Sequence, residues 1–322
     1  MGLRKFLVIF TIAVVILMAA VVWFFPSNDD YRLENPFWNG TSDIDQITPV
    51  SMLESLSELP SAPQGSTLIL VPYLPFTPDE LATLDSFISE GGVLILADDY
   101  GFGNQVLEYL GTGGRFSGES LLDPLFNYKN QWFPRIFHLR TEPLTDEVQG
   151  LLLNHSTCLL GVADNEVLAK SSSFSFLDQN GNGERDADEA IGPLPVISRL
   201  SLAQGQLILV ADPSLFINSM EILANNYALI KNIAAINSSQ LLIDYSHLPP
   251  SNLHETKSIL SHIHDFLITP LGTLLLVISV LVLTLSPLWW RKGLGREIRG
   301  ILFRLRQRAV RLQIKAKRGR LR

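Results

Sequence analysis

Cysteine is almost absent from this sequence of 322 residues, because Cys158 is the only one. A single cysteine excludes a disulfide within the chain, so the fold must rest on its apolar core, for which the 47% hydrophobic content is sufficient. A catalytic cysteine would also need a tight strand-to-helix turn and a histidine to activate it. Residues 154–160 offer no glycine for such a turn. With no nucleophile elbow and no catalytic triad evident, the sequence favours a non-enzymatic function.

Basic residues are scarce in the middle of the chain. Residues 6–290 hold ten Lys or Arg against thirty-one acids, a balance that excludes nucleic acid as a partner. The net charge is nevertheless only −7, since residues 291–322 carry thirteen Lys or Arg and one acid, while Arg4 and Lys5 stand at the other end. Both basic segments adjoin long apolar runs, which indicates membrane topology.

Two uncharged runs, residues 6–25 and 267–290, are long enough to cross the roughly 30 Å hydrocarbon layer as helices. The alternative for the first run is a cleaved signal peptide, with Met18-Ala19-Ala20 as the processing site. Its apolar stretch exceeds the ~7 to 15 residues of a typical signal core, which favours a retained anchor.

The positions of the basic flanks predict that both termini face the cytoplasm and that the protein resides in the cell membrane with two spans. The expected organisation is a cytoplasmic N-terminus (1–5), a first transmembrane helix (6–25), an extracytoplasmic domain (26–266), a second transmembrane helix (267–290) and a basic amphipathic cytoplasmic tail (291–322).

Residues 178–189 fit the twelve-residue calcium loop D-x-[DN]-x-[DN]-G-x5-E at every constrained position. Calcium prefers many oxygen ligands, and the extracellular concentration fills even weak sites. No helices are expected on either side, so we predict a structural calcium loop between β-rich segments, not an EF-hand; the alternative is a solvated turn. The predicted ligands are Asp178, Asn180, Asn182, the carbonyl of Glu184, Asp186 and Glu189.

The domain between the apolar runs has the rhythm of an α/β fold. Residues 67–71, 93–97 and 206–211 are continuous apolar runs, typical of parallel strands buried on both faces. A helix over residues 77–90 is indicated by Thr at its N-cap, Pro at its first position and glycines after its end. Residues 195–202 and 206–211 flank Gln-Gly, a hairpin signal. We therefore predict an amidotransferase- or flavodoxin-like parallel sheet with a β-hairpin and the calcium-loop insertion.

Two shorter segments also give predictions. Residues 49–59 place apolar side chains at helical spacing, so a helix is expected from Pro49. Phe37 and Trp38 lie in a loop and are aromatics of the kind that is usually buried.

A ligand cleft is predicted at the carboxyl ends of the strands, where open parallel sheets bind their ligands. The strand at 93–97 ends in Asp98 and Asp99 and is followed by Asn104, while the strand at 206–211 ends in Asp212. The spacing G-x-G-x-x-G is missing here and two acids would repel an anion, which argues against nucleotide binding. The alternative interpretation is that the acids cap a turn and a helix.

Residues 90–104, Glu-Gly-Gly-Val-Leu-Ile-Leu-Ala-Asp-Asp-Tyr-Gly-Phe-Gly-Asn, resemble the family known as domain of unknown function 4350. Residues 35–40, 115–118 and 209–214 share this resemblance, which extends over residues 35–240. The resemblance implies an anchored extracytoplasmic domain related to the class I glutamine amidotransferase fold, with some members similar to auxiliary subunits of exporters or gliding machinery. It implies no activity.

Two functions are consistent with these features. The first is a membrane-anchored extracytoplasmic binding or scaffold protein, an accessory subunit of a transport or envelope complex with a membrane-protein or envelope partner and an unspecified small ligand. The second is a hydrolase of cell-envelope polymers that uses Asp98 and Asp212 as its acid and base.

Overall fold

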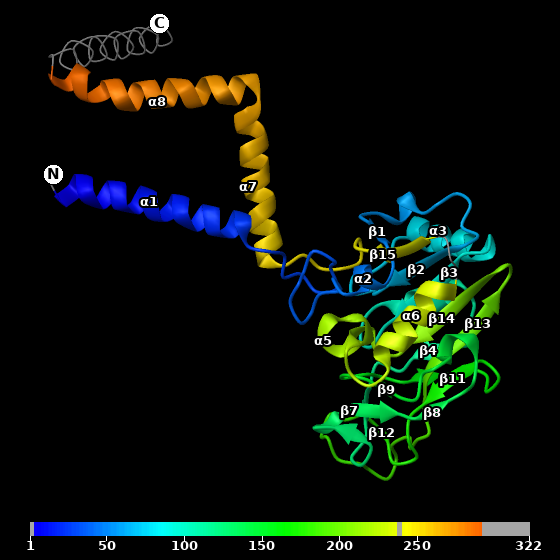
Figure 1. Ribbon diagram of the computed structural model, residues 1–322. Helices are drawn as coiled ribbons and strands as arrows, with labels where there is room; N and C mark the ends of the chain where they lie inside the picture. The colour runs from blue at the N-terminus through cyan, green and yellow to red at the C-terminus, as the bar shows by residue number, and fades with distance from the viewer. Residues whose placement is uncertain (1–2, 237–239, 292–322) are drawn as a thin grey trace, which may run out of the picture. The chain divides into compact units, whose positions relative to one another are not determined.

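The computed structural model describes residues 3–236 and 240–291 (Figure 1). The chain divides into two compact units, Met1–Thr256 and Lys257–Arg322. The first contains helix α1 (Leu3–Phe24) and a mixed α/β domain with the large core.

A mostly parallel sheet of eight strands forms the centre of the domain. Five neighbouring strands are parallel, and the last three continue the sheet in antiparallel pairing. Every residue of β2 and β3 is buried, as the continuous apolar runs predicted. In order across the sheet, the strands are β1 (Val50–Leu53), β15 (Gln240–Asp244), β2 (Ser66–Leu70), β3 (Val93–Ala97), β14 (Gly205–Val210), β13 (Pro195–Leu202), β11 (Val167–Lys170) and β8 (His138–Leu139).

Helix α3 (Pro78–Ser89) connects β2 to β3 and is defined locally by its sequence. The Thr77 hydroxyl accepts a hydrogen bond from the Glu80 backbone nitrogen, and the Glu80 carboxylate accepts one from the Thr77 nitrogen at 2.7 Å, a complete capping box. The helix stops before Gly91, whose φ of +104° suits glycine. The remaining helices of the domain are α2 (Ile44–Ile47), α4 (Gly103–Tyr109), α5 (Asn218–Glu221) and α6 (Asn226–Ile236), with 3-10 turns η1 (Leu56–Glu58), η2 (Pro143–Thr145) and η3 (Pro213–Phe216).

A β-rich insertion separates α4 from β13, and β8 and β11 of the large sheet also come from it. The expected hairpin is present, since β13 and β14 pair antiparallel from Ile197 with Val210 to Leu202 with Gly205. The smaller sheets pair β4 (Arg115–Phe116) with β10 (Leu159–Leu160), β5 (Ser120–Leu122) with β12 (Phe176–Asp178), and β7 (Asn130–Ile136) with β6 (Asn127–Tyr128) and β9 (Leu151–Leu152).

The helix expected from Pro49 is wrong. The chain instead forms β1, which extends the parallel sheet by pairing with β15, and then the short turn η1. The gain of a hydrogen-bonded ladder at the sheet edge outweighs the helical spacing of a few apolar residues. The expected burial of Phe37 and Trp38 is also wrong, since both side chains are exposed.

Residues 6–24 of α1 are long and apolar enough to cross a membrane, and none of that stretch is buried inside the protein. The second expected span overlaps α8 (Pro270–Arg291), which follows α7 (Asn252–Ile268) after a bend of 87°. Among the residues that the structure describes, α7 and α8 are long and apolar enough to cross a membrane only if the bent pair is counted as one segment. The basic tail lies outside the described residues, apart from Arg291 at the end of α8.

Candidate functional site

Parallel strands bring several polar side chains to one edge of the large sheet. Asp98 and Asp99 directly follow β3, Asp212 follows β14, and Tyr73 comes shortly after β2. Because these strands are parallel neighbours, their carboxyl ends coincide. This edge is where open α/β sheets bind ligands, because the loops there diverge and leave a crevice.

The Asp98 carboxylate binds backbone nitrogens of the protein itself. It accepts hydrogen bonds from the backbone nitrogens of Gly101 at 2.8 Å and Gly103 at 2.7 Å, so it fixes the turn that leads into α4. Burial raises the pKa of Asp98 to about 6, although these two donors act in the opposite direction. The backbone nitrogens that could have cradled an anion are thus already bound to a carboxylate.

Asp212 has a similar capping role but is more deeply buried. Its carboxylate accepts hydrogen bonds from the backbone nitrogens of Asn154 at 2.6 Å and Ser214 at 2.8 Å. Burial, together with the charge of Asp99, raises the pKa of Asp212 to about 7 against the effect of both donors. Asp212 therefore joins the end of β14 to the loop after β9.

Asp99 is the carboxylate that acts electrostatically on its surroundings. Its charge raises the pKa of Asp212 and also that of Tyr31 and Tyr73. Burial raises the pKa of Asp99 itself, while hydrogen bonds from the Tyr100 nitrogen and the Tyr73 hydroxyl lower it. Asp99, Asp212 and the two tyrosines consequently form one group at this edge.

Asn104 has a local role instead. Its side chain donates a hydrogen bond to the Phe116 carbonyl and accepts one from the Phe116 nitrogen, both at 2.9 Å. These bonds attach α4 to the start of the insertion.

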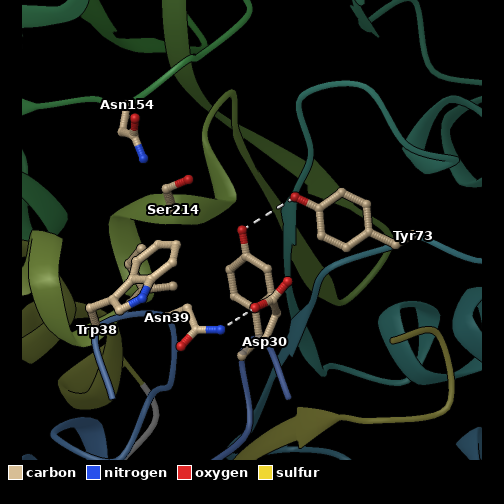
Figure 2. A pocket seen from close by; sticks show the side chains of 8 residues that line it. Asp30, Trp38, Asn39, Tyr73, Asn154 and Ser214 are labelled. Atoms are coloured by element: carbon tan, nitrogen blue, oxygen red, sulfur yellow. Dashed lines mark hydrogen bonds between the residues drawn. The ribbon is translucent and has the colours of Figure 1, made fainter. Parts of the chain in front are cut away.

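A pocket of about 230 Å³ opens beside the group of carboxylates and tyrosines (Figure 2). The hydroxyls of Tyr31 and Tyr73 lie 3.2 Å apart, and Asn39 donates a hydrogen bond to Asp30. The lining residues are Asp30, Tyr31, Trp38, Asn39, Tyr73, Asn154, Ser214 and Ile217. Of the sequence-predicted cleft residues, Asp98, Asp99, Asn104 and Asp212, none lines this pocket, but Asp99 and Asp212 support the residues that do.

The residues that line the pocket are mostly polar, and none of them carries a positive charge. Its eight residues include no Lys, Arg or His, but they present three hydroxyls, two amides and one carboxylate. Burial raises the pKa of both Tyr31 and Tyr73 above the ordinary value, so the phenols stay protonated at neutral pH. The pocket can therefore hydrogen-bond a ligand, and its lining contains no activated nucleophile.

The family model described as "Domain of unknown function (DUF4350)" matches residues 35–234. The chain belongs to this family. The DUF4350 region includes six of the pocket residues, from Trp38 to Ile217, while Asp30 and Tyr31 precede it. It also ends before β15, although β15 lies within the large sheet.

No curated protein matches the chain in sequence. Among solved structures, the DUF4350 chain is similar to the mmIFT52 N-terminal domain, with 14% identity, a TM-score of 0.42, and coverage of 57% of this chain and 80% of that one. A β-galactosidase from Bacillus circulans sp. alkalophilus matches with 14% identity, a TM-score of 0.34, and coverage of 54% and 23%. A putative ThuA-like protein from Bacteroides uniformis matches with 12% identity, a TM-score of 0.32, and coverage of 63% and 78%. Such low TM-scores and identities say nothing of what the DUF4350 protein binds or does.

The predicted calcium loop lies in the DUF4350 region and begins at the last residue of β12, and its polar side chains bind one another and the backbone. Asp178 accepts hydrogen bonds from the nitrogens of Gly181, Asn182 and Gly183 at 2.8 to 3.1 Å. Glu189 accepts two more, at 3.0 Å, from the nitrogens of Gln179 and Asp186.

The two asparagines of the loop converge on one carboxylate. The amide nitrogens of Asn180 and Asn182 donate to Asp186 Oδ2 at 2.6 and 2.9 Å, and the backbone nitrogen of Glu184 donates to Asn182 Oδ1. Within residues 3–236 and 240–291, no three His, Cys, Asp or Glu side chains are grouped closely enough to hold a metal ion.

A second buried cluster of the DUF4350 protein lies after β15. His247 Nδ1 is 2.8 Å from Asp244 Oδ2, and the Ser246 hydroxyl donates to Asp244 Oδ1 at 2.6 Å. The Ser246 hydroxyl also lies 3.0 Å from the same Nδ1. A catalytic triad needs serine and carboxylate on opposite nitrogens of the ring, so this arrangement is structural.

Sequence reasoning missed the pocket itself. Tyr31 carries no motif, Asn39 enters only through the family resemblance, and Trp38 is expected to be buried and not to line a pocket. Tyr73 did carry a usable signal, because it follows a predicted buried strand as Asp98 does.

Proposed function

We propose that this protein is a membrane-anchored, extracytoplasmic binding protein that holds a small ligand in the pocket at the carboxyl end of its parallel sheet. The observation that supports this proposal is the lining of the pocket, which gathers hydroxyl, amide and carboxylate groups from four separate parts of the chain. Convergent polar groups in a concave site are characteristic of ligand binding.

Binding without catalysis agrees with the hydrogen bonds of the buried carboxylates. Asp98 and Asp212 are each held by two backbone nitrogens, and neither faces the pocket as a lining residue. A protein of this kind can serve as an accessory subunit that delivers or senses a ligand for a transport or envelope complex.

A hydrolase of cell-envelope polymers is the second candidate. It is favoured by the raised pKa of Asp98, to about 6, and of Asp212, to about 7, because an acid catalyst must retain its proton near neutral pH. Release of new reducing ends from cell-wall polysaccharide by the full-length protein, lost in Asp212→Asn, would establish hydrolysis. Equal release by wild type and variant, or none, would reject this candidate.

The membrane arrangement is also part of the proposal. Helix α1 supplies one segment of sufficient length, and α8 covers most of the second apolar run. The basic residues beside both runs favour cytoplasmic termini and an external domain. The amidotransferase-like relationship of this domain is likewise proposed, on the basis of its parallel sheet and its family membership.

Calcium in the loop at residues 178–189 belongs to the same proposal. The loop holds Asp178, Asp186 and Glu189 on one short segment, and Glu189 stands at its last position, where calcium loops carry a bidentate glutamate. The side-chain oxygens of Asn180 and Asn182 accept from the backbone nitrogens of Asn182 and Glu184, and an amide oxygen has a second lone pair that can serve as a ligand for a cation.

The binding function is tested with the full-length protein in lipid nanodiscs and a library of small polar compounds, monitored by saturation-transfer NMR. The proposal is supported by compounds that bind wild type but no longer bind Asn154→Phe, in which the larger side chain fills the pocket. Asn165→Phe is the matched control, because Asn165 is exposed and lies outside the pocket lining. If every bound compound is insensitive to Asn154→Phe, or none binds, the proposed function is wrong.

A further inference from the structure

We infer that the pocket selects an uncharged, hydroxyl-rich ring, that is, a saccharide unit, and that Trp38 forms the surface on which the ring stacks. The inference rests on the proposed binding function and names the chemical class of its ligand. It follows from the charge, the hydrogen-bonding groups, the aromatic surface and the size of the pocket.

The charges around the pocket oppose an anion. Its lining has no cationic side chain, and it includes the carboxylate of Asp30. Asp99 and Asp212 do not line the pocket but act electrostatically on its tyrosines. A phosphate, a sulfate or a carboxylate ligand would have no counter-charge here and would leave its own charge uncompensated.

The hydrogen-bonding groups favour hydroxyls over an ammonium group. Tyr31, Tyr73 and Ser214 each offer a hydroxyl that both donates and accepts, and Asn154 adds an amide with both functions. An ammonium group only donates, so it would leave the amide and hydroxyl donors without a partner. A sugar hydroxyl donates and accepts at once and can satisfy such a mixed lining.

Trp38 adds an apolar surface at the mouth of the pocket. It has 67% of its surface exposed, which is unusual for a side chain of this size, and Figure 2 shows the indole beside Asn39. Its backbone is held in place, because its carbonyl accepts a hydrogen bond from the Ser219 nitrogen at 3.1 Å and the neighbouring Phe37 carbonyl accepts one from the Asn218 side chain at 2.7 Å. An exposed aromatic face on such a backbone can cover the apolar C–H face of a sugar ring.

The size of the pocket limits the ligand to one unit. Its volume of about 230 Å³ is below the ~300 to 1,000 Å³ that is usual for sites of drug-sized molecules. The pocket therefore accepts a free monosaccharide or the terminal unit of a longer chain.

The experiment compares sugars that share a ring and differ in charge. Full-length protein in nanodiscs is titrated with neutral glucose, galactose, mannose and N-acetylglucosamine, with glucuronate and galacturonate, and with glucosamine, by saturation-transfer NMR and calorimetry. We expect at least one neutral sugar to bind and its uronate to bind at least tenfold more weakly. A disaccharide ending in the same unit distinguishes a chain end from the free sugar as the natural source.

The variants locate the binding. Trp38→Ala should weaken binding of the neutral sugar at least tenfold. The melting temperature should not change, because the side chain is exposed. Trp38→Phe should recover part of the affinity. Trp132→Ala is the matched control, since Trp132 stacks on His155 at 4.8 Å and does not line the pocket. Equal binding after Trp38→Ala overturns the inference, as does tighter binding of a uronate or of glucosamine.

The failure of this inference can be told apart from the failure of the proposed function. If no neutral sugar binds, but other compounds bind wild type and not Asn154→Phe, the pocket binds ligands of a different class and only the inference is wrong. If no compound is sensitive to Asn154→Phe, both are wrong.

Discussion

The carboxylate of Asp212 accepts a 2.6 Å hydrogen bond from the backbone nitrogen of Asn154, which is 58 residues away in the sequence. The bond joins the end of a parallel strand to the β-rich insertion. Asn154 lines the pocket and Asp212 does not, so the buried carboxylate positions a wall of the pocket from behind. The shape of the pocket and the stability of the fold thus depend on the same contact.

Replacing Asp212 should change how stability depends on pH. Burial and the charge of Asp99 raise the folded pKa of Asp212 to about 7, whereas an unfolded aspartate titrates near ~3.9. The stabilising contribution of this carboxyl is therefore complete below about pH 4 and is lost as the pH rises toward 7. Each unit of pKa difference corresponds to ~1.4 kcal/mol, so the loss is on the order of a few kcal/mol.

The measurement is the melting temperature of the full-length protein between pH 4.5 and 7.5. Wild type should lose stability over this range more steeply than Asp212→Asn, in which the titrating group is absent. Asp85→Asn, at an exposed position of α3, should keep the wild-type slope. Identical slopes for wild type and Asp212→Asn would contradict the pKa assigned to this carboxyl.

Asp98→Ala should destabilise the domain by roughly 1 to 3 kcal/mol, because it removes the acceptor of the Gly101 and Gly103 nitrogens and the latter is buried. Asp79→Ala, at an exposed position in the first turn of α3, should cost much less. Thermal unfolding of both variants provides the comparison. A cost for Asp98→Ala no larger than that of the control would show that these hydrogen bonds contribute little.

Calcium should stabilise the protein through the loop at residues 178–189. With the ~10⁻⁴ to 10⁻³ M affinity of extracellular modules, 10 mM calcium would add roughly 1.4 to 2.7 kcal/mol. Glu189→Gln should abolish the calcium-dependent rise in melting temperature, whereas Glu184→Gln should retain it, since Glu184 is expected to contribute only its carbonyl. The same rise in both variants, or none in wild type, would show that the loop is an ordinary polar turn.

The parts of the fold that could be predicted are those that local sequence determines. The apolar runs of β2, β3 and β14 are buried on both faces, so their composition alone indicates parallel strands. The capping residues of α3 likewise predict its start. Strand β15 was not recognised, and its neighbour β1 was expected to be helical, because each is stabilised by pairing with a distant strand.

The sequence predicts which polar residues follow the strands, but not the pocket. Asp98 and Asp212 lie at the carboxyl edge of the sheet because each follows a parallel strand, but their side chains turn inward to bind backbone nitrogens. The pocket depends on the approach of Tyr31 and Tyr73, which is set by packing between segments 42 residues apart. Periodicity and motifs do not report contacts of this kind.

The buried Cys158 allows the proposed membrane topology to be tested with single cysteines. The side chain is fully buried, and burial raises the pKa of its thiol to about 12, so it should not react with a maleimide at neutral pH. A cysteine introduced as Ser61→Cys, at an exposed position between η1 and β2, should react in intact cells with a membrane-impermeant maleimide. A cysteine added after Arg322 should react only once the cells are lysed, because the basic flank is expected to lie in the cytoplasm. Wild type shows the background labelling of Cys158 alone. If the added C-terminal cysteine is labelled from outside and Ser61→Cys is protected, the orientation is the reverse of the one proposed.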